Sequence, residues 1–150
     1  MELTARFDYQ ELLQIITKHQ KYLNGESGGE KAILCGVNLY SASLIGVNLQ
    51  KADLSGINLK RSLLCEANLE GADLSGAFFK HAVMEGANLK NANLSKANLW
   101  GANLSHVKLE GADLTRADLE DVCLEGATYD NLTRWPAGFD PVSKGAIYHT

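Results

Sequence analysis

Leucine recurs at every fifth position over most of this chain, in units that read alanine, asparagine or aspartate, leucine and two variable residues. The stretch ANLKNANLSKANLWGANLS, residues 87–105, is typical. On an α-helix a five-residue step turns the leucines around the whole cylinder, and on a continuous strand an odd period sends alternate leucines to opposite faces. If the chain instead bends once per unit, every leucine can point inward, and the intervening Asn, Asp, Ser and Gly suit the bend. The period therefore predicts a solenoid with buried leucine columns.

The register of the repeat is uninterrupted. Central residues run from Leu34 to Tyr129 in steps of five, which gives twenty units, and seventeen of these centres are leucine. Ala, Val, Ile or Ser stands two residues before every centre. A repeat of this regularity is the strongest indication of the fold that the sequence offers. We expect three parts: an N-terminal helical cap (1–31), the repeat region (32–131) and a C-terminal cap or tail (132–150).

Two stretches, ANLSKANLWGANLS and GADLTRADLEDV, resemble the pentapeptide-repeat proteins, whose consensus is A(D/N)LXX. The resemblance covers about residues 32–131 and implies an all-β solenoid, a right-handed quadrilateral β-helix with four units per coil. Twenty units then make about five coils, and residues twenty apart lie above each other. At about 4.8 Å per coil the rod is about 24 Å tall. A core of Leu and Ala at native packing density leaves no internal cavity for a ligand.

The two ends of the chain break the repeat. Asp8 is placed as an N-cap, apolar residues follow at helical spacing and Gly25 stops the pattern, so we expect a helix over residues 9–23 that lies on the first coil. The residues expected on its buried face are Tyr9, Leu12, Leu13, Ile16 and Leu23. After the repeats we expect Trp135 and Phe139 to fold back over the last coil, although the tail could instead dock a partner.

Composition and charge narrow the function classes. The net charge of −4 argues against a nucleic-acid surface, and the absence of a long apolar run argues against a membrane span. We expect a cytoplasmic protein. Three cysteines, an odd number, stand in no C-x-x-C pair, so we expect neither a disulfide nor a zinc site. The polar positions of a flat-sided rod do not converge on a pocket, and we assign no catalytic, cofactor-binding or metal-binding residues.

Candidate contact residues lie where the repeat departs from its consensus. On the third face Leu63 and Val83 stand before the central residue, where the consensus has Asn or Asp, and Phe78 lies around a corner. Beside the second face, Tyr40 and Trp100 follow the central residues in a column that also carries lysines. Exposed apolar and aromatic side chains of this kind can mark a protein contact site. The alternative is that a tail or the N-terminal helix covers the third-face positions, or that these residues are there only because they favour β structure.

A candidate acidic patch lies in the last coil, residues 111–130, which nets −5 while the earlier coils net between 0 and +1. Its proposed members are Asp113, Asp118, Glu120, Asp121 and Glu125. These observations favour a non-catalytic protein-interaction or scaffold module with an unidentified protein partner, present as a monomer or weak dimer. The alternative, suggested by the resemblance, is a DNA mimic that modulates DNA gyrase. Duplex DNA carries about one charge per 1.7 Å, so a mimic about 24 Å tall would need on the order of fourteen negative charges. The repeat region has a net charge of only −3.

Overall fold

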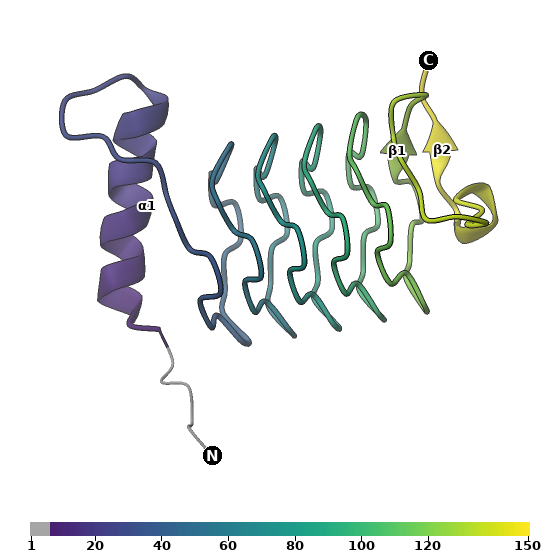
Figure 1. The fold of residues 1–150 in the computed structure, drawn as a ribbon, viewed down its shortest axis with the longest axis horizontal. Helices are drawn as coiled ribbons and strands as arrows, with labels where there is room; N and C mark the ends of the chain where they lie inside the picture. Colours follow the sequence, from purple (N-terminus) through teal and green to yellow (C-terminus); the bar gives the residue numbers. More distant parts are fainter. Residues whose placement is uncertain (1–6) are drawn as a thin grey trace.

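Most of the chain is a stack of turns and single bridges rather than long strands. The computed structural model describes residues 7–150, so the first six residues of the expected 1–31 segment lie outside the described residues. Figure 1 shows α1 (Tyr9–Leu23) across one end of a row of coils, with β1 (Thr128–Tyr129) and β2 (Ile147–Tyr148) at the other end.

Successive coils pair through parallel bridges between residues twenty positions apart. Asp53 bridges Asp73, which in turn bridges Asn93, and the same spacing recurs on the other three faces. The amide of Asp73 donates to the preceding coil at Ala52, and the carbonyl of Asp73 accepts from Leu54 of that same coil at 2.8 Å. Backbone groups are therefore satisfied from coil to coil, as in a parallel sheet.

The interior of the stack is filled by the central residues of the units. Leu54, Leu74 and Leu94 lie in one column and are each 1% exposed or less. The two larger centres, Phe79 and Met84, are also fully buried, so they fill the core. Burying a side chain of this size contributes about 1.5–3 kcal/mol. The stacking of residues twenty apart, which the family resemblance implies, is confirmed by the bridges.

Each corner of the stack is a four-residue turn whose third residue is left-handed. The amide of Ala42 donates to the carbonyl of Leu39 at 3.0 Å, and Ser41 between them has a φ of 56°. This is the pattern of a type II turn. Its left-handed third position is unfavourable by on the order of 1 kcal/mol for a residue with a Cβ, whereas glycine adopts it at almost no cost. Gly56 and Gly76 occupy such positions. The variable fifth position is therefore a conformational site as well as a surface site.

The boundaries of α1 match the predicted helix and follow from its caps. The Asp8 carboxylate accepts a hydrogen bond from the Gln10 amide at 3.0 Å. At the other end Gly25 has a φ of 70°, and the Glu26 amide donates back to the Lys21 carbonyl at 2.9 Å. This is a Schellman ending, in which a left-handed glycine reverses the chain.

α1 contacts the first coil with a narrower face than predicted. Leu12 and His19 are buried, and Ile16 is partly buried against the core. Tyr9 and Leu13 are 67% and 47% exposed, so their assignment to the buried face is wrong. The reason is geometric: at 100° per residue they point about 70° and about 110° away from the middle of the Leu12–His19 stripe. A flat coil contacts only a narrow stripe of a helix.

His19 joins α1 to the first coil through both ring nitrogens. The Ala32 amide donates to Nδ1 at 3.0 Å, so Nε2, 3.0 Å from the Gln50 carbonyl oxygen, carries the proton. Burial lowers the pKa of His19, the bond to the Gln50 carbonyl opposes this, and the nearby Lys31 cation lowers the pKa further. The imidazole is thus a neutral structural group with one fixed tautomer.

The C-terminal segment continues the stack with a changed register. Arg134 bridges Asp113, twenty-one residues earlier, whereas Ile147 of β2 pairs with Thr128 of β1, nineteen residues earlier. The short 3-10 helix η1 (Val142–Lys144) lies between these two contacts in sequence. The spacing between paired residues is therefore one residue longer than the twenty-residue period at Arg134 and one residue shorter at Ile147.

Asp130 and Thr133 accommodate the first change of register. The Gly111 amide donates to the Asp130 carboxylate at 3.0 Å, whereas regular corners use a backbone carbonyl for this bond. The same carboxylate accepts from the Thr133 amide, and the Thr133 hydroxyl donates to the Leu109 carbonyl at 2.9 Å. Side chains thus replace the backbone where the chain leaves the period.

The aromatic residues beyond this point lie against the core. Trp135 and Phe139 are partly buried and stack with ring centroids 5.3 Å apart. Trp135 also meets the ring of Tyr129 edge-on at 5.5 Å. The apolar end of the last coil is in this way covered by a small aromatic cluster.

Candidate functional site

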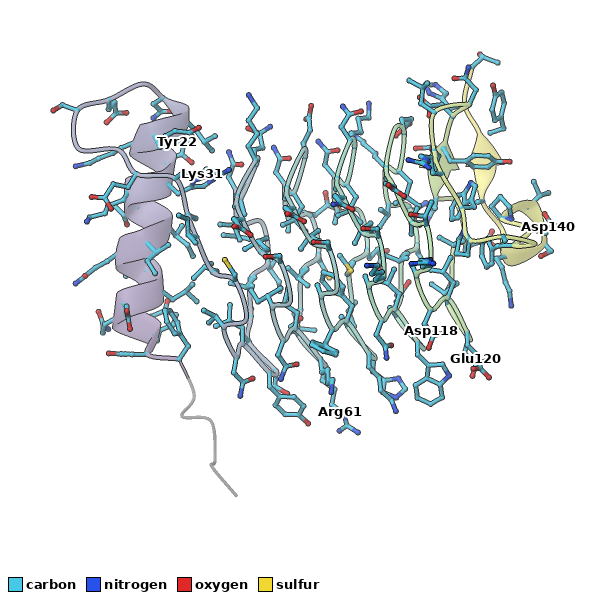
Figure 2. All side chains as sticks on the ribbon, in the orientation of Figure 1. Tyr22, Lys31, Arg61, Asp118, Glu120 and Asp140 are labelled. Carbon is cyan, nitrogen blue, oxygen red and sulfur yellow. The ribbon has the colours of Figure 1, made fainter. Side chains whose placement is uncertain are left out.

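The second corner, where the second face meets the third, consists of two columns of side chains. The first column is Tyr40, Lys60, Lys80, Trp100 and Glu120, and the second is Ser41, Arg61, His81, Gly101 and Asp121. Backbone bonds hold the columns in register, because the Arg61 amide donates to Lys80 and the His81 amide donates to Trp100, both at 3.0 Å. Figure 2 shows Arg61, Asp118 and Glu120 along one edge of the rod.

Cations and aromatic rings are in contact along this corner. The Lys80 ammonium lies 4.0 Å from the centre of the Trp100 ring, and the His81 ring meets the same indole edge-on at 4.8 Å. The Lys60 ammonium lies 5.1 Å from the centre of the Phe78 ring. These are cation–π distances, and they explain why Trp100 is only half-exposed.

Phe78, Leu63 and Val83 replace residues that stabilise the turns elsewhere. At the equivalent place Asn98 accepts a hydrogen bond from the Trp100 amide at 3.1 Å. An apolar side chain cannot accept that bond, so each of the three residues gives up a local hydrogen bond that most units keep. Their effect is to put apolar groups on the surface.

The exposure of the five predicted contact residues varies. Tyr40, Phe78 and Leu63 are 44%, 42% and 40% exposed, whereas Val83 and Trp100 are half-buried. Leu63 bridges Val83, so these two side chains lie side by side on the third face. Neither α1 nor the C-terminal segment covers Leu63, which decides against the alternative of a covered third face at that position.

The five predicted acidic residues do not share one face. Asp118, Glu120 and Asp121 lie together at the last coil of the second corner, where the Glu120 amide donates to the Asp118 carboxylate at 3.1 Å. Asp113 lies on the first face, 3.6 Å from the Arg134 guanidinium, and Glu125 lies on the next corner. The acidic patch is therefore a group of three beside the basic part of the second corner.

Asp113 is a carboxylate held in its ionised form. Its partial burial alone raises the pKa, but hydrogen bonds from the amide and hydroxyl of Thr115 and the charge of Arg134 outweigh burial and hold the pKa below its ordinary value. This is the environment of a structural carboxylate that accepts hydrogen bonds from the turn that follows it.

Sequence reasoning missed two members of the second corner, Arg61 and His81. Both occupy left-handed turn positions whose residue type varies from unit to unit, with φ of 57°, so nothing in the five-residue pattern marks them. A signal was available: aligning the chain in rows of twenty puts Arg61 and His81 beside Lys60 and Lys80. The four residues form a recognisable group only when the two columns are read side by side.

A second exposed apolar group lies at the helical end. Tyr9 and Leu13 of α1 face Ile45 of the first coil across a shallow hollow, and Ile45 is 57% exposed. This group carries no unpaired charge pattern comparable to that of the second corner. It follows from the narrow contact face of α1.

Metal and membrane features are absent from residues 7–150. This part of the chain contains no group of three or more His, Cys, Asp and Glu that could hold a metal ion. None of its helices has the length and apolar character needed to cross a bilayer. The cysteines Cys35, Cys65 and Cys123 are all free thiols.

A family model for pentapeptide repeats matches residues 30–61, 62–101 and 92–128, with eight copies. A search among curated protein sequences found no match.

Similar solved structures are also pentapeptide repeat proteins. Rfr23 from the cyanobacterium Cyanothece 51142 is 44% identical over 66% of this chain and 64% of its own, with a TM-score of 0.45. A protein of the Arabidopsis thaliana thylakoid lumen is 30% identical over 65% of this chain and 61% of its own, with a TM-score of 0.44. HetL from Nostoc sp. strain PCC 7120, involved in heterocyst differentiation regulation, is 25% identical over 83% of this chain and 72% of its own, with a TM-score of 0.50. The chain thus matches less than two thirds of the length of the first two.

Proposed function

Because the chain belongs to the pentapeptide repeat family, whose members form right-handed β-helices and are generally non-enzymatic, we propose that it is a non-catalytic protein-interaction module. Its partner contacts the second corner and the adjoining third face through Phe78, Leu63, Val83, Tyr40 and Trp100. In this proposal twenty units form five coils of quadrilateral cross-section, and α1 and the C-terminal segment cap the two ends.

One observation carries the proposal. Phe78, Leu63 and Val83 occupy bridge positions at which Asn or Asp would hydrogen-bond to the following turn, yet Phe78 and Leu63 keep 42% and 40% of their surface exposed. A residue that costs local stability and leaves apolar surface in water has a use outside the fold. Tyr40 and Trp100 add aromatic surface of the type that dominates binding energy at protein interfaces.

One set of substitutions can remove the apolar surface and at the same time restore the residue that the repeat prefers. In the variant Leu63→Asn/Phe78→Asn/Val83→Asn each apolar group becomes the residue that the repeat prefers, so we expect unchanged or higher stability in urea denaturation. We expect the same variant to lose the partner that the native protein retains in quantitative affinity purification from its own cells. Ile33→Asn is the matched control, because Ile33 is 65% exposed at the equivalent position on the first face. Equal retention of every partner by the triple variant would show the proposal to be wrong.

The alternative of a DNA-mimic modulator of DNA gyrase has less support. The repeat region nets only −3, and only three of the five candidate acids lie on one corner. A rod about 24 Å tall would need on the order of fourteen charges to match duplex DNA. We also propose a reducing compartment such as the cytoplasm, supported by the three free thiols, and a monomeric or weakly dimeric state.

A further inference from the structure

Three cations stand together on the second corner without an acidic partner. Lys60, Arg61 and Lys80 come from neighbouring coils, and none of them takes part in an ion pair within residues 7–150. The molecule as a whole nets −4, so this is a local reversal of its charge. Adjacent coils are about 4.8 Å apart, which places the three charges within reach of one ligand segment.

The rings beneath these cations hold them in place. Lys80 lies over Trp100 at 4.0 Å and Lys60 lies toward Phe78 at 5.1 Å. A cation–π contact occupies only the side of the ammonium that faces the ring, so each lysine keeps N–H donors on its outer side for an acceptor from outside. Side chains already ordered lose less entropy on binding. Arg61 adds a planar fork that can take a carboxylate with two hydrogen bonds.

Apolar surface lies directly beside the cations. Phe78, Leu63 and Val83 come from the same two coils as Lys60, Arg61 and Lys80, and so form one mixed surface with them. The acids Asp118, Glu120 and Asp121 follow on the same corner in the last coil, with only Trp100 and Gly101 between. A ligand with negative charge is therefore attracted to the middle coils and repelled from the last one.

We propose that the partner segment bound at the second corner is an acidic polypeptide stretch in which Asp or Glu alternates with large apolar residues. This inference rests on the proposed function and names its partner by chemistry. Carboxylates meet Lys60, Arg61 and Lys80, while the apolar residues cover Phe78, Leu63 and Val83. The four coils from Tyr40 to Trp100 span about 19 Å, which equals the length of about six residues of an extended partner segment.

Other polyanions fit this surface less well. A single-stranded nucleic acid also seeks cations and aromatic rings. It extends its charge along the whole rod, however, and would meet Asp118, Glu120 and Asp121 on the same corner. It also has no use for Leu63 and Val83, which are aliphatic and offer no ring for a base to stack on.

The test measures binding of a pool of labelled peptides, about ten residues long, with Asp or Glu at alternate positions and Leu, Ile or Phe between them. We expect binding by fluorescence anisotropy that weakens with salt. A second pool with Asn and Gln in place of the acids is expected not to bind. The variant Lys60→Glu/Arg61→Glu/Lys80→Glu should bind the acidic pool about tenfold more weakly or worse.

A matched control separates local from global charge. Lys51→Glu/Lys90→Glu/Lys96→Glu makes the same change of net charge on other corners, and Lys51 and Lys96 share the left-handed backbone of Arg61, with φ of 59° and 60° against 57°. Glutamate is tolerated in this conformation, since Glu66 has a φ of 57°. The control variant should bind the acidic pool nearly as well as the native protein.

Several outcomes overturn the inference. These are equal binding of both pools, equal loss in both charge variants, binding of a dT oligonucleotide in preference to the acidic pool, or charge-dependent self-association in sedimentation without peptide binding. If the native partner depends on Phe78, Leu63 and Val83 but not on Lys60, Arg61 and Lys80, the inference fails and the proposed function stands. If the partner depends on neither group, both fail.

Discussion

The two ends of the stack are closed by different means. At the helical end α1 lies across the first coil and holds it through a few side chains, chiefly Leu12 and the neutral ring of His19. At the other end the backbone continues to pair: the Leu114 amide donates to Arg134, and the Ile147 amide donates to Ala127, both at 2.7 Å. At the helical end, the contact with the stack depends on a few side chains, so most of its stability rests on those residues. At the C-terminal end the stability is distributed over backbone hydrogen bonds, but this pairing requires a turn that changes the register.

The largest expected effect is at the helical end. Leu12→Ala removes the main apolar contact between α1 and the first coil, and we expect the free energy of unfolding to fall by about 2–5 kcal/mol. Leu13→Ala is the control, since its neighbour Leu13 is 47% exposed, and it should cost much less. Urea denaturation gives both values. Similar losses in the two variants would mean that α1 does not hold the first coil through Leu12.

The second prediction concerns the polar contact at the same end. His19→Leu leaves the Ala32 amide and the Gln50 carbonyl without their partner, and we expect a cost of about 2–4 kcal/mol.

The lowered pKa of His19 also makes this end sensitive to acid. The contribution of neutral His19 to the free energy of unfolding is fully present above the ordinary histidine pKa of 6.5. As the pH falls below 6.5 the unfolded chain takes up a proton before the folded chain does, so stability falls until the pH reaches the lowered pKa of the folded state. NMR titration of His19 and denaturation between pH 8 and about pH 4 check this. A His106→Gln variant, changed on an exposed corner, should keep the acid dependence, and His19→Leu should lose it.

At the C-terminal end a smaller effect is expected from a hydroxyl group. Thr133→Val keeps the shape but removes the hydroxyl that donates to the Leu109 carbonyl and accepts from the Asp130 amide, and we expect a loss of about 1–2 kcal/mol. Thr150→Val, in the last residue, is the control. Amide hydrogen exchange should quicken near β1 and β2 while α1 is unaffected. Faster exchange in α1 would contradict the independence of the two ends.

The smallest effect provides a reference from the middle of the rod. Gly56 has a φ of 62° and open space where a Cβ would lie, so Gly56→Ala should cost about 1 kcal/mol through backbone conformation alone. The reverse change, Lys96→Gly, lies in the same column with a φ of 60° and should stabilise by a similar amount or slightly less. Equal stability of both variants would show that the left-handed turns carry no strain.

The five-residue period predicted a bending chain with buried leucines, because helix and continuous strand both fail to bury them. The columns of residues twenty apart needed the family resemblance as well, since the period alone permits other cross-sections. The bounds of α1 followed from Asp8 and Gly25, whose roles are local. The exposure of Tyr9 and Leu13 could not be predicted in the same way, since the width of a helix contact depends on the flatness of the coil it meets. The register change at Asp130 was also missed, because an aspartate that replaces a backbone carbonyl looks like any other corner residue in the sequence.

The candidate site was predicted only in part. Phe78, Leu63 and Val83 were visible as departures from the consensus, but the charge of the second corner appears only when Arg61 is placed beside Lys80 of the next coil. Such neighbours are nineteen residues apart and belong to different positions of the repeat. The acidic patch was predicted too large for the converse reason. Its five residues belong to one coil, but a coil runs around the whole rod, so Asp113 and Glu125 lie on different sides of it.

The twenty-residue spacing of the bridges also constrains how such a chain can lengthen. Adding four units inserts one full coil and leaves every downstream residue above its former neighbour. Adding a single unit instead turns all later residues by a quarter of the circumference, so that Trp100 would no longer lie above Lys80. Length can therefore change without turning one part of the surface against another only in multiples of four units, and even a full coil preserves the second corner only if it is inserted outside the coils from Lys60 to Trp100.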